Sequence, residues 1–360
     1  MKQLLVLLLV VLSVPAFSQT ISGYVYDEAE NKPLEGAFVY LDGTTLSAST
    51  DANGFFRINA GQKYNSALII TFIGFETLRV EDPFGYGKPF KALLREDAIS
   101  LNEVVINKKK GPFSRREMMR VFRDEFLGKS KAGSSCKIEN EQDIILYYDP
   151  DDNTLHAEAT KPLRIINDCL QYKIIFDLAG FAVSYKVKSL SPLYMSRSYF
   201  AGTTFFTDIA KKKEKAEKIR KETYLGSTVH LMKTIVAEDW QKQKFGFYTG
   251  SFPDNPKEYF AVSDSLNYKK VTLLKVPEAS SAEKNIFING PKPDAQHKFR
   301  GVSFNILYDK KEQSSFSFNK GYFYVDGNGL FFPINELTFG GYMAGMKAGD
   351  LLPADYEYKE

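Results

Sequence analysis

The chain has 360 residues, and its 47 Lys and Arg against 44 Asp and Glu leave a net charge of only +3. A nucleic-acid-binding domain normally has a strong excess of basic residues, so this near balance excludes a dedicated nucleic-acid binder. Aromatic residues make up 14% of the chain, with 29 Phe and 21 Tyr against one Trp. This bias is typical of strand-rich proteins, and we expect a mainly β or α+β fold.

The first eighteen residues have the pattern of a cleavable secretory signal. A short basic start precedes the apolar run Leu4–Leu12, and the small-residue site Ala16–Ser18 comes before Gln19. A transmembrane helix needs about 20 apolar residues, and no run in the chain reaches that length. We therefore expect export with cleavage before Gln19 and a location in the periplasm or at the outer membrane. Because the first cysteine is Cys136, no thiol stands at the cleavage site, and a lipoprotein is not expected.

Short apolar segments divided by turn residues follow, and their spacing predicts seven or eight strands of a small antiparallel sandwich. Asp51-Ala52-Asn53-Gly54 separates two of them, because Asn and Gly tolerate the positive φ of a tight hairpin. Gly23 and Gly36 are expected to mark a bulge or a tight turn. The expected strands are Ile21–Tyr26, Ala37–Leu41, Thr45–Thr50, Phe55–Ile58, Leu68–Phe72, Thr77–Val80, Lys91–Leu94 and Glu103–Ile106.

Four stretches of this region, taken in order, resemble the carboxypeptidase-regulatory-like domain, a prealbumin-type β-sandwich. They are Ile21–Val25, Pro33–Ala37, Thr50–Phe56 and Phe72–Glu76. The same module precedes the plug and barrel of many outer-membrane nutrient receptors, and Leu101–Ile106 is similar to the stretch that leads into the plug. The residues that follow are too few for a barrel of about 22 strands. The resemblance therefore implies the module without the receptor.

The composition changes after the sandwich. Lys108-Lys109-Lys110-Gly111-Pro112 is charged, contains Gly and Pro and joins two unlike patterns, which is typical of a domain boundary. We expect a signal peptide at 1–18, the sandwich at 19–107, a basic linker at 108–113 and a larger α+β domain at 114–360.

The second domain is expected to open with a helix. Ser114 can cap it and Glu117 can complete a capping box, and apolar residues then follow on one face up to Gly128. The expected strands of this domain are Ile144–Tyr148, Thr154–Glu158, Gln171–Leu178, Phe181–Val187, Lys270–Val276, Val302–Leu307, Ser315–Phe318 and Gly321–Val325.

A long polar helix is expected from Phe205 to about Trp240, with a break near Gly226. Its basic run, Lys211–Lys221, has two interpretations. It is either an ordinary solvated helix face, which we prefer, or a patch for anionic lipid or polysaccharide, since each clustered lysine near a charged surface adds about 1 kcal/mol.

Six groups of residues in the second domain resemble the conserved partner of the regulatory-like module in a family of exported bacterial proteins of unknown function. The resemblance implies membership of that family and no activity. The groups are Phe126–Gly128, Cys136–Ile138, Lys161–Leu163, Tyr172–Ile174, Tyr224–Ser227 with His230, and the tail from Gly341-Tyr342 through Leu351–Tyr356.

No motif for catalysis or metal binding stands out. The three histidines, His156, His230 and His297, form no His-x-x-Glu or His-Glu-x-x-His arrangement of the kind that zinc peptidases use. The serine-hydrolase elbow and the phosphate-loop and dinucleotide signatures are also missing. We expect no catalytic residue, no metal and no cofactor, and we do not expect an enzyme.

Two sets of residues each have two interpretations. His230 is either a packed histidine bonded to the backbone or part of a ligand groove with Tyr224 and Ser227. Cys136 and Cys169 either form a disulfide, which an oxidising compartment permits, or are two unpaired thiols.

The function expected from these observations is non-catalytic binding or scaffolding in the cell envelope, with an envelope protein or a polysaccharide as partner. Contact would be made through exposed aromatic surface or open sheet edges. The alternative is an envelope hydrolase with an unrecognised site at His230, which would need two carboxylates beside that histidine in one deep pocket.

Overall fold

The protein is described by a computed structural model that covers residues 19–97, 111–277, 299 and 301–358. The expected signal peptide, the expected strand Glu103–Ile106 and the linker lysines Lys108–Lys110 lie outside the described residues. The chain divides into two compact units, one of residues 1–42 and 46–104 and one of residues 43–45 and 105–360.

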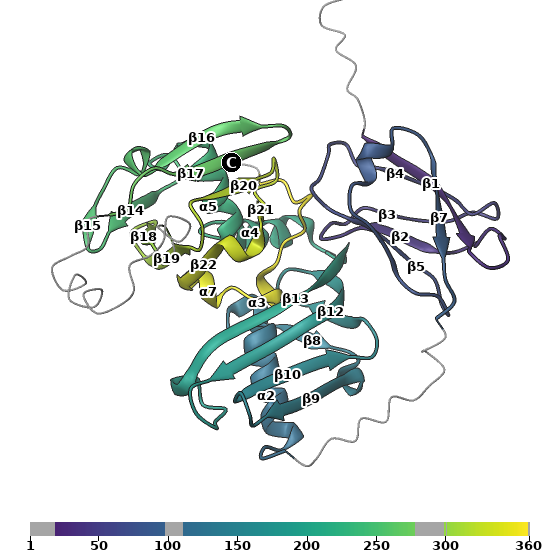
Figure 1. The fold of residues 1–360 in the computed structure, drawn as a ribbon, viewed down its shortest axis with the longest axis horizontal. Coiled ribbons are helices and arrows are strands. Elements are labelled where there is room, and N and C mark those ends of the chain that lie inside the picture. Colours follow the sequence, from purple (N-terminus) through teal and green to yellow (C-terminus); the bar gives the residue numbers. More distant parts are fainter. Residues whose placement is uncertain (1–18, 98–110, 278–298, 300, 359–360) are drawn as a thin grey trace, which may run out of the picture. The chain divides into compact units, whose positions relative to one another are not determined.

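The first unit is a sandwich of seven strands in two sheets, drawn in purple and blue in Figure 1. One sheet has the order β4-β1-β7 and the other the order β3-β2-β5-β6. The strands are β1 Thr20–Asp27, β2 Phe38–Leu41, β3 Ser47–Ser49, β4 Phe55–Asn59, β5 Leu68–Thr71, β6 Leu78–Val80 and β7 Phe90–Leu94. The expected seven-stranded sandwich is confirmed, except that β7 runs parallel to β1, so the sandwich is not wholly antiparallel.

Turn chemistry explains the hairpin that leads into β4. The Asp51 side chain accepts hydrogen bonds from the backbone N–H groups of Asn53 and Phe55, both at 2.9 Å. Gly54 has φ +73°, and a Cβ there would lie 2.5 Å from a backbone oxygen of β1. Gly23 has a different role from the expected bulge or turn, because it lies within β1, where a Cβ would come 2.7 Å from a backbone oxygen of β7.

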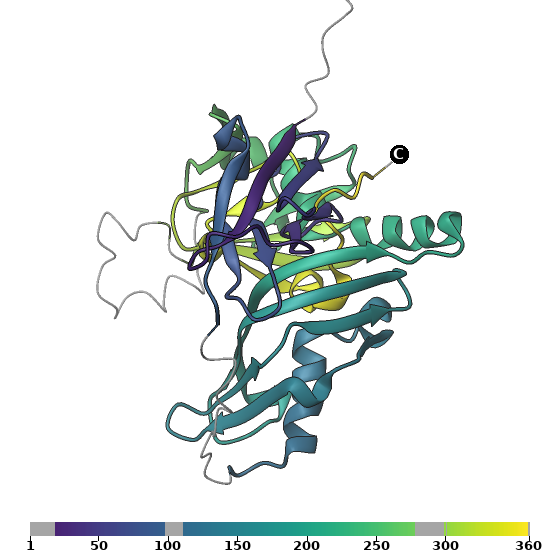
Figure 2. The same cartoon turned by 90° about the vertical axis from the view of Figure 1, so that its right-hand side faces the viewer.

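The second unit contains a six-stranded sheet of order β8-β11-β12-β10-β9, with β13 paired to the other side of β12. Helix α2 lies across one face of this sheet (Figures 1 and 2). The elements are α2 Arg115–Phe126, α3 Lys131–Ser134, β8 Cys136–Ile138, β9 Ile144–Asp149, β10 Thr154–Ala159, β11 Leu163–Asn167, β12 Tyr172–Tyr185 and β13 Met195–Asp208.

The expected capping box at the start of α2 is confirmed. Ser114 Oγ accepts from the Glu117 N–H at 3.3 Å, and Glu117 Oε2 accepts from the Ser114 N–H at 2.8 Å. Phe122 and Phe126 are fully buried, and the Phe122 ring lies 4.8 Å from Phe181 of β12. The apolar face of α2 is therefore the surface that covers the sheet.

Two long strands differ from the expected pattern. The segments 171–178 and 181–187 form one strand, β12, with an irregularity between Leu178 and Gly180 where the register to β13 shifts. The helix expected from Phe205 is wrong at its start, because Phe205–Asp208 is the end of β13. Phe206 is paired with Ile174 of β12 and is buried, so pairing across the sheet outweighs the local helical pattern.

The rest of the second unit has two more sheets around an aromatic core. One has the order β15-β14-β18-β19-β22 and the other the order β16-β17-β20-β21. The elements are α4 Lys213–Tyr224, α5 Thr228–Ala237, β14 Phe245–Thr249, β15 Phe252–Pro253, β16 Phe260–Ser265, β17 Tyr268–Leu273, β18 Ser303–Tyr308, β19 Glu312–Phe318, β20 Tyr322–Val325, β21 Phe331–Phe332, β22 Leu337–Gly341 and α7 Tyr342–Gly345.

The aromatic core of these two sheets is built mainly from phenylalanine. Phe304, Phe316 and Phe318 are at most 1% exposed, and their rings lie 5.5 to 6.1 Å apart, within the range of favourable aromatic contacts. None of the helices in the described part of the chain is both long enough and apolar enough to span a membrane.

Candidate functional site

The junction of α4 and α5 contains the residues for which the sequence left a ligand groove open. Gly226 has φ +80° and separates the two helices, which confirms the expected break. A Cβ at Gly226 would lie 2.8 Å from the Tyr308 ring, so both the backbone conformation and the packing favour glycine. Ser227 then caps α5, because its Oγ accepts from the His230 N–H at 3.2 Å.

His230 is held by hydrogen bonds at both ring nitrogens. Nδ1 accepts from the Gly226 N–H at 3.0 Å, which leaves Nε2 to carry the proton and to donate to Gln243 Oε1 at 2.9 Å. Gln243 in turn donates to Asp239 Oδ2 at 3.0 Å. Burial lowers the pKa of His230, which keeps the ring neutral.

The imidazole is also packed on its faces. Its ring lies 4.9 Å from Phe245 and 5.0 Å from Tyr224, and the side chain is only 2% exposed. His230 therefore joins α5 to the neighbouring sheet as a core residue. In this arrangement neither nitrogen is free to accept a proton from the Ser227 hydroxyl.

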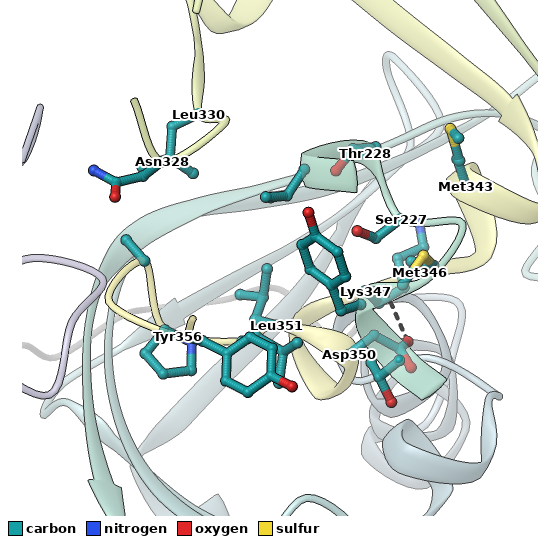
Figure 3. Close-up of a pocket in the computed structure, with 16 residues that line it drawn as sticks. Ser227, Thr228, Asn328, Leu330, Met343, Met346, Lys347, Asp350, Leu351 and Tyr356 are labelled. Carbon is teal, nitrogen blue, oxygen red and sulfur yellow. Dashed lines mark hydrogen bonds between the residues drawn. The ribbon is translucent and has the colours of Figure 1, made fainter. Parts of the chain in front are cut away.

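A cavity of about 150 Å³ lies beside the same junction. Figure 3 shows Leu351 and Tyr356 of the C-terminal segment along one side of it, and Ser227 and Met346 at one end. Most of the lining is apolar. The residues are Thr223, Tyr224, Ser227, Thr228, Val229, Asn328, Leu330, Met343, Met346, Lys347, Asp350, Leu351, Leu352, Pro353, Ala354 and Tyr356.

The charged residues of the cavity wall are bonded to other parts of the protein. Asp350 accepts from Ser130 Oγ at 2.6 Å and from the Lys347 N–H at 3.2 Å, the second of which is the dashed line in Figure 3. Burial raises the pKa of Asp350. The Lys347 ammonium lies 3.6 Å from Glu125 Oε2. These bonds position the segment that follows α7, so both residues have a structural role.

The structure brings two of the three groove residues to this cavity. Tyr224 and Ser227 line it, whereas His230 is not among the lining residues and lies in the core behind them. The methionines and the C-terminal segment Leu351–Tyr356 were not assigned to a site from the sequence. The only available signal was that this tail carries part of the family resemblance.

Cys136 and Cys169 are free thiols in the structure, so the bridge that the sequence left open is not formed in it. Cys136 begins β8, and its Sγ donates to Ala132 O at 3.4 Å. Burial raises the pKa of Cys136 to about 12 and also raises that of Cys169. Neither thiol is activated as a nucleophile in this state.

Of the other two histidines, the structure describes only His156. The His156 ring stacks on Tyr147 at 5.0 Å, and His297 lies outside the described residues. Within the ranges that the structure describes, no three or more His, Cys, Asp or Glu side chains gather in a way that could hold a metal ion.

Comparison with known proteins identifies the first unit. Residues 21–106 match the family model of the CarboxypepD_reg-like domain. The TonB-dependent receptor SusC of Bacteroides thetaiotaomicron is 32% identical over 97 residues, which are 26% of this chain and 9% of the receptor. The chain therefore spans less than a tenth of the length of this relative.

Two solved structures that match this chain are only distantly similar to it. A type II cohesin–X-dockerin complex from Acetivibrio cellulolyticus matches 31% of this chain and 76% of its own at 21% identity, with a TM-score of 0.19. A 9R-lipoxygenase from Cyanothece PCC8801 matches 62% of this chain and 49% of its own at 10% identity, with a TM-score of 0.16. Neither overlap is close enough to indicate a shared fold. The family match thus rests on the sandwich, and residues 21–106 of this protein form a CarboxypepD_reg-like domain.

Proposed function

We propose that this protein is a non-catalytic binding protein of the bacterial cell envelope, and that the cavity beside α4 and α5 receives an apolar part of its ligand. The observation that carries the proposal is the lining: mostly apolar side chains, with the charged groups of the wall bonded within the protein. A cavity of about 150 Å³ is large enough for one benzene-sized ring. Met343 and Met346 in its wall can adapt to ligands of different shape.

The alternative hydrolase is less well supported by the geometry. A serine hydrolase needs a base within hydrogen-bond reach of its nucleophile. Ser227 caps a helix, and both nitrogens of His230 are engaged by Gly226 and Gln243. Asp350 is the one carboxylate among the cavity's lining residues, so the two carboxylates that such a site would need do not meet there with His230.

The envelope location draws on the likeness to an outer-membrane receptor and on the signal pattern before Gln19. SusC is named as a TonB-dependent receptor, and its similarity to this chain lies in a small part of its length. We therefore do not propose transport for this protein. We do propose the envelope location, with an envelope protein or a polysaccharide as the source of the ligand.

A small apolar probe of one ring tests the binding site. Fluorobenzene, followed by 19F NMR, should bind residues 19–360, and Met346→Trp should weaken this binding at least tenfold because the larger side chain fills the cavity. Leu193→Trp is the matched control, since Leu193 is 80% exposed and does not line the cavity; its affinity should stay within twofold of the wild type. If Met346→Trp lowers the melting temperature strongly, Leu351→Trp replaces it. If a cavity variant melts at the wild-type temperature and binds the probe as tightly as the wild type does, the proposal is contradicted.

The hydrolase alternative and the location need separate measurements. Ester, peptide and glycoside substrates should show no turnover above the background, and any turnover that His230→Gln abolishes would favour the hydrolase. Fractionation of the native cells with an antibody against the chain should place it in the envelope fraction. Recovery mainly from the cytoplasm would contradict the envelope location.

A further inference from the structure

A second hollow in the second unit has a different character from the apolar cavity. Its volume is about 570 Å³, it is open to solvent, and it shares no lining residue with the cavity beside α5. Cavities of about 300 to 1,000 Å³ are the usual size of small-molecule sites. The lining residues, which we call the lysine basin, are Lys131, Ser135, Asp168, Cys169, Gln171, Lys211, Lys212, Lys215, Ala216 and Ile219.

Four lysines from two separate segments meet in this basin. Lys131 belongs to α3, whereas Lys211, Lys212 and Lys215 belong to the start of α4 and the turn before it, some eighty positions later in the chain. Asp168 is the one carboxylate among the lining residues. The basin thus carries a formal charge of about +3 that the tertiary fold, and not the sequence run alone, has assembled.

None of these four lysines forms an ion pair with another described residue. In the part of the chain that the structure describes, no carboxylate lies within ion-pair distance of Lys131, Lys211, Lys212 or Lys215. Like charges held around one concave surface raise the local positive potential and attract anions. An anionic ligand would relieve this repulsion, and the open basin leaves it room.

The floor of the basin is less polar than its rim. Ala216 is buried and Ile219 and Cys169 are half-buried, whereas the four lysines are exposed. The hydroxyl of Ser135 is already engaged, since it donates to Ala132 O at 2.7 Å and accepts from the Cys169 N–H at 3.0 Å. Gln171 Nε2 likewise already donates to Asp168 O at 2.7 Å. The ammonium groups are therefore the main donors that remain for a ligand.

We infer that the lysine basin binds a ligand with two or more phosphate groups. Lysine ammonium groups suit phosphate as compact point charges, and several of them match the high charge of neighbouring phosphates better than that of single carboxylates. A soluble polyphosphorylated molecule and a lipid headgroup share this chemistry. The inference is independent of the apolar cavity, because the two sites have no residue in common.

Tripolyphosphate is the probe for the soluble source, titrated calorimetrically into residues 19–360 at low ionic strength. The double variant Lys131→Gln/Lys212→Gln should lose at least tenfold in affinity. The double variant Lys188→Gln/Lys218→Gln changes the net charge equally at exposed positions outside the basin and should lose less than twofold. Binding in the wild type should weaken steeply with added salt.

A second readout places the ligand at the basin without relying on affinity. Cys169 lines the basin and is half-exposed, so bound tripolyphosphate should slow its alkylation severalfold in the wild type and not in the Lys131→Gln/Lys212→Gln variant. Flotation with phosphatidylcholine vesicles containing cardiolipin, whose headgroup carries two phosphate groups, tests the lipid source. Vesicle binding that the basin variant loses assigns the site to lipid headgroups, and tripolyphosphate binding without vesicle binding assigns it to soluble ligands.

Three results would overturn the inference. The first is that neither tripolyphosphate nor the vesicles bind. The second is an equal loss of affinity in both double variants, which would indicate net charge and no site. The third is that a carboxylate-only oligogalacturonate binds as tightly as tripolyphosphate, which would assign the basin to acidic polysaccharide. Fluorobenzene binding by the same variants should be unchanged, so failure here is distinguishable from failure of the apolar cavity.

Discussion

Replacing Arg220 by methionine should destabilise the second unit by about 3 kcal/mol. The Arg220 side chain is 7% exposed and joins α4 to the turn between β11 and β12. Its Nε donates to Leu170 O at 2.9 Å, one Nη donates to Gln171 O at 3.1 Å, and the guanidinium lies 3.8 Å above the Tyr172 ring. Two further bonds of 2.9 and 3.0 Å reach the carboxylate of Asp208.

The expected loss of stability follows from the interactions of Arg220 that methionine cannot make. The buried carbonyl of Leu170 loses its donor, which costs about 1 to 3 kcal/mol. The contact with the Tyr172 ring contributes about 1 to 2 kcal/mol. The ion pair adds only about 0 to 1 kcal/mol, because the Asp208 side chain is 43% exposed and water screens it. Methionine keeps the packing of the aliphatic stem, and the terms overlap, so the expected total stays near 3 kcal/mol.

Urea unfolding followed by Trp240 fluorescence measures this loss. Trp240 is the single tryptophan of the chain, is buried, and lies in the second unit, so its emission reports that unit alone. Lys218→Met on the exposed side of α4 is the control and should change stability by less than about 0.5 kcal/mol. A loss for Arg220→Met no larger than that of the control would refute the assigned role of the guanidinium.

The effect of Arg220→Met on stability should depend on pH. The hydrogen bonds from Arg220 hold the pKa of Asp208 below its usual value. A carboxyl group with a lowered pKa in the folded state stabilises the protein above its unfolded pKa of about 3.9, and this contribution is lost as the pH falls through the folded pKa. The stability difference between wild type and Arg220→Met should therefore shrink below about pH 4.

Three further outcomes are expected of the second unit. Burial lowers the pKa of His230, so as the pH falls the unfolded state binds a proton before the folded state does. The free energy of unfolding should therefore fall as the pH drops below about 6.5, by at most about 1.4 kcal/mol per pH unit, and His230→Gln should flatten that slope in urea titrations. Phe122→Ala removes a fully buried ring and should cost about 3 to 5 kcal/mol by the same assay, against less than about 0.5 kcal/mol for exposed Arg116→Ala. Native thiol labelling at pH 8 should modify Cys169 before Cys136, whose pKa is raised to about 12 by burial; finding no free thiol in the unreduced, denatured protein would instead show that the two are bridged.

Much of the local structure was readable from the sequence because it depends on neighbouring residues. The capping box of Ser114 and Glu117 and the hairpin at Asp51–Gly54 satisfy backbone groups within a few positions of themselves. The break at Gly226 needs only a positive φ. The seven strands of the sandwich followed from alternation and turns, since each buries one face.

The tertiary structure decided what depends on distant partners. Phe205–Asp208 has a local helical pattern and lies in β13, because β12 offers a complete row of hydrogen-bonding partners beside it. The parallel pairing of β7 with β1 could not be predicted either, because the spacing of apolar residues indicates a strand but not which strands lie beside it.

The candidate sites show the same division. The sequence pointed to Tyr224, Ser227 and His230, and only packing separated the first two, which line the cavity, from the third, which is locked in the core. The lysine run near residue 211 was visible, but its convergence with Lys131 was not. Charge and hydrophobicity are properties of single residues and can be read along the chain, whereas a cavity is space left between segments, and its position is fixed only when those segments pack together.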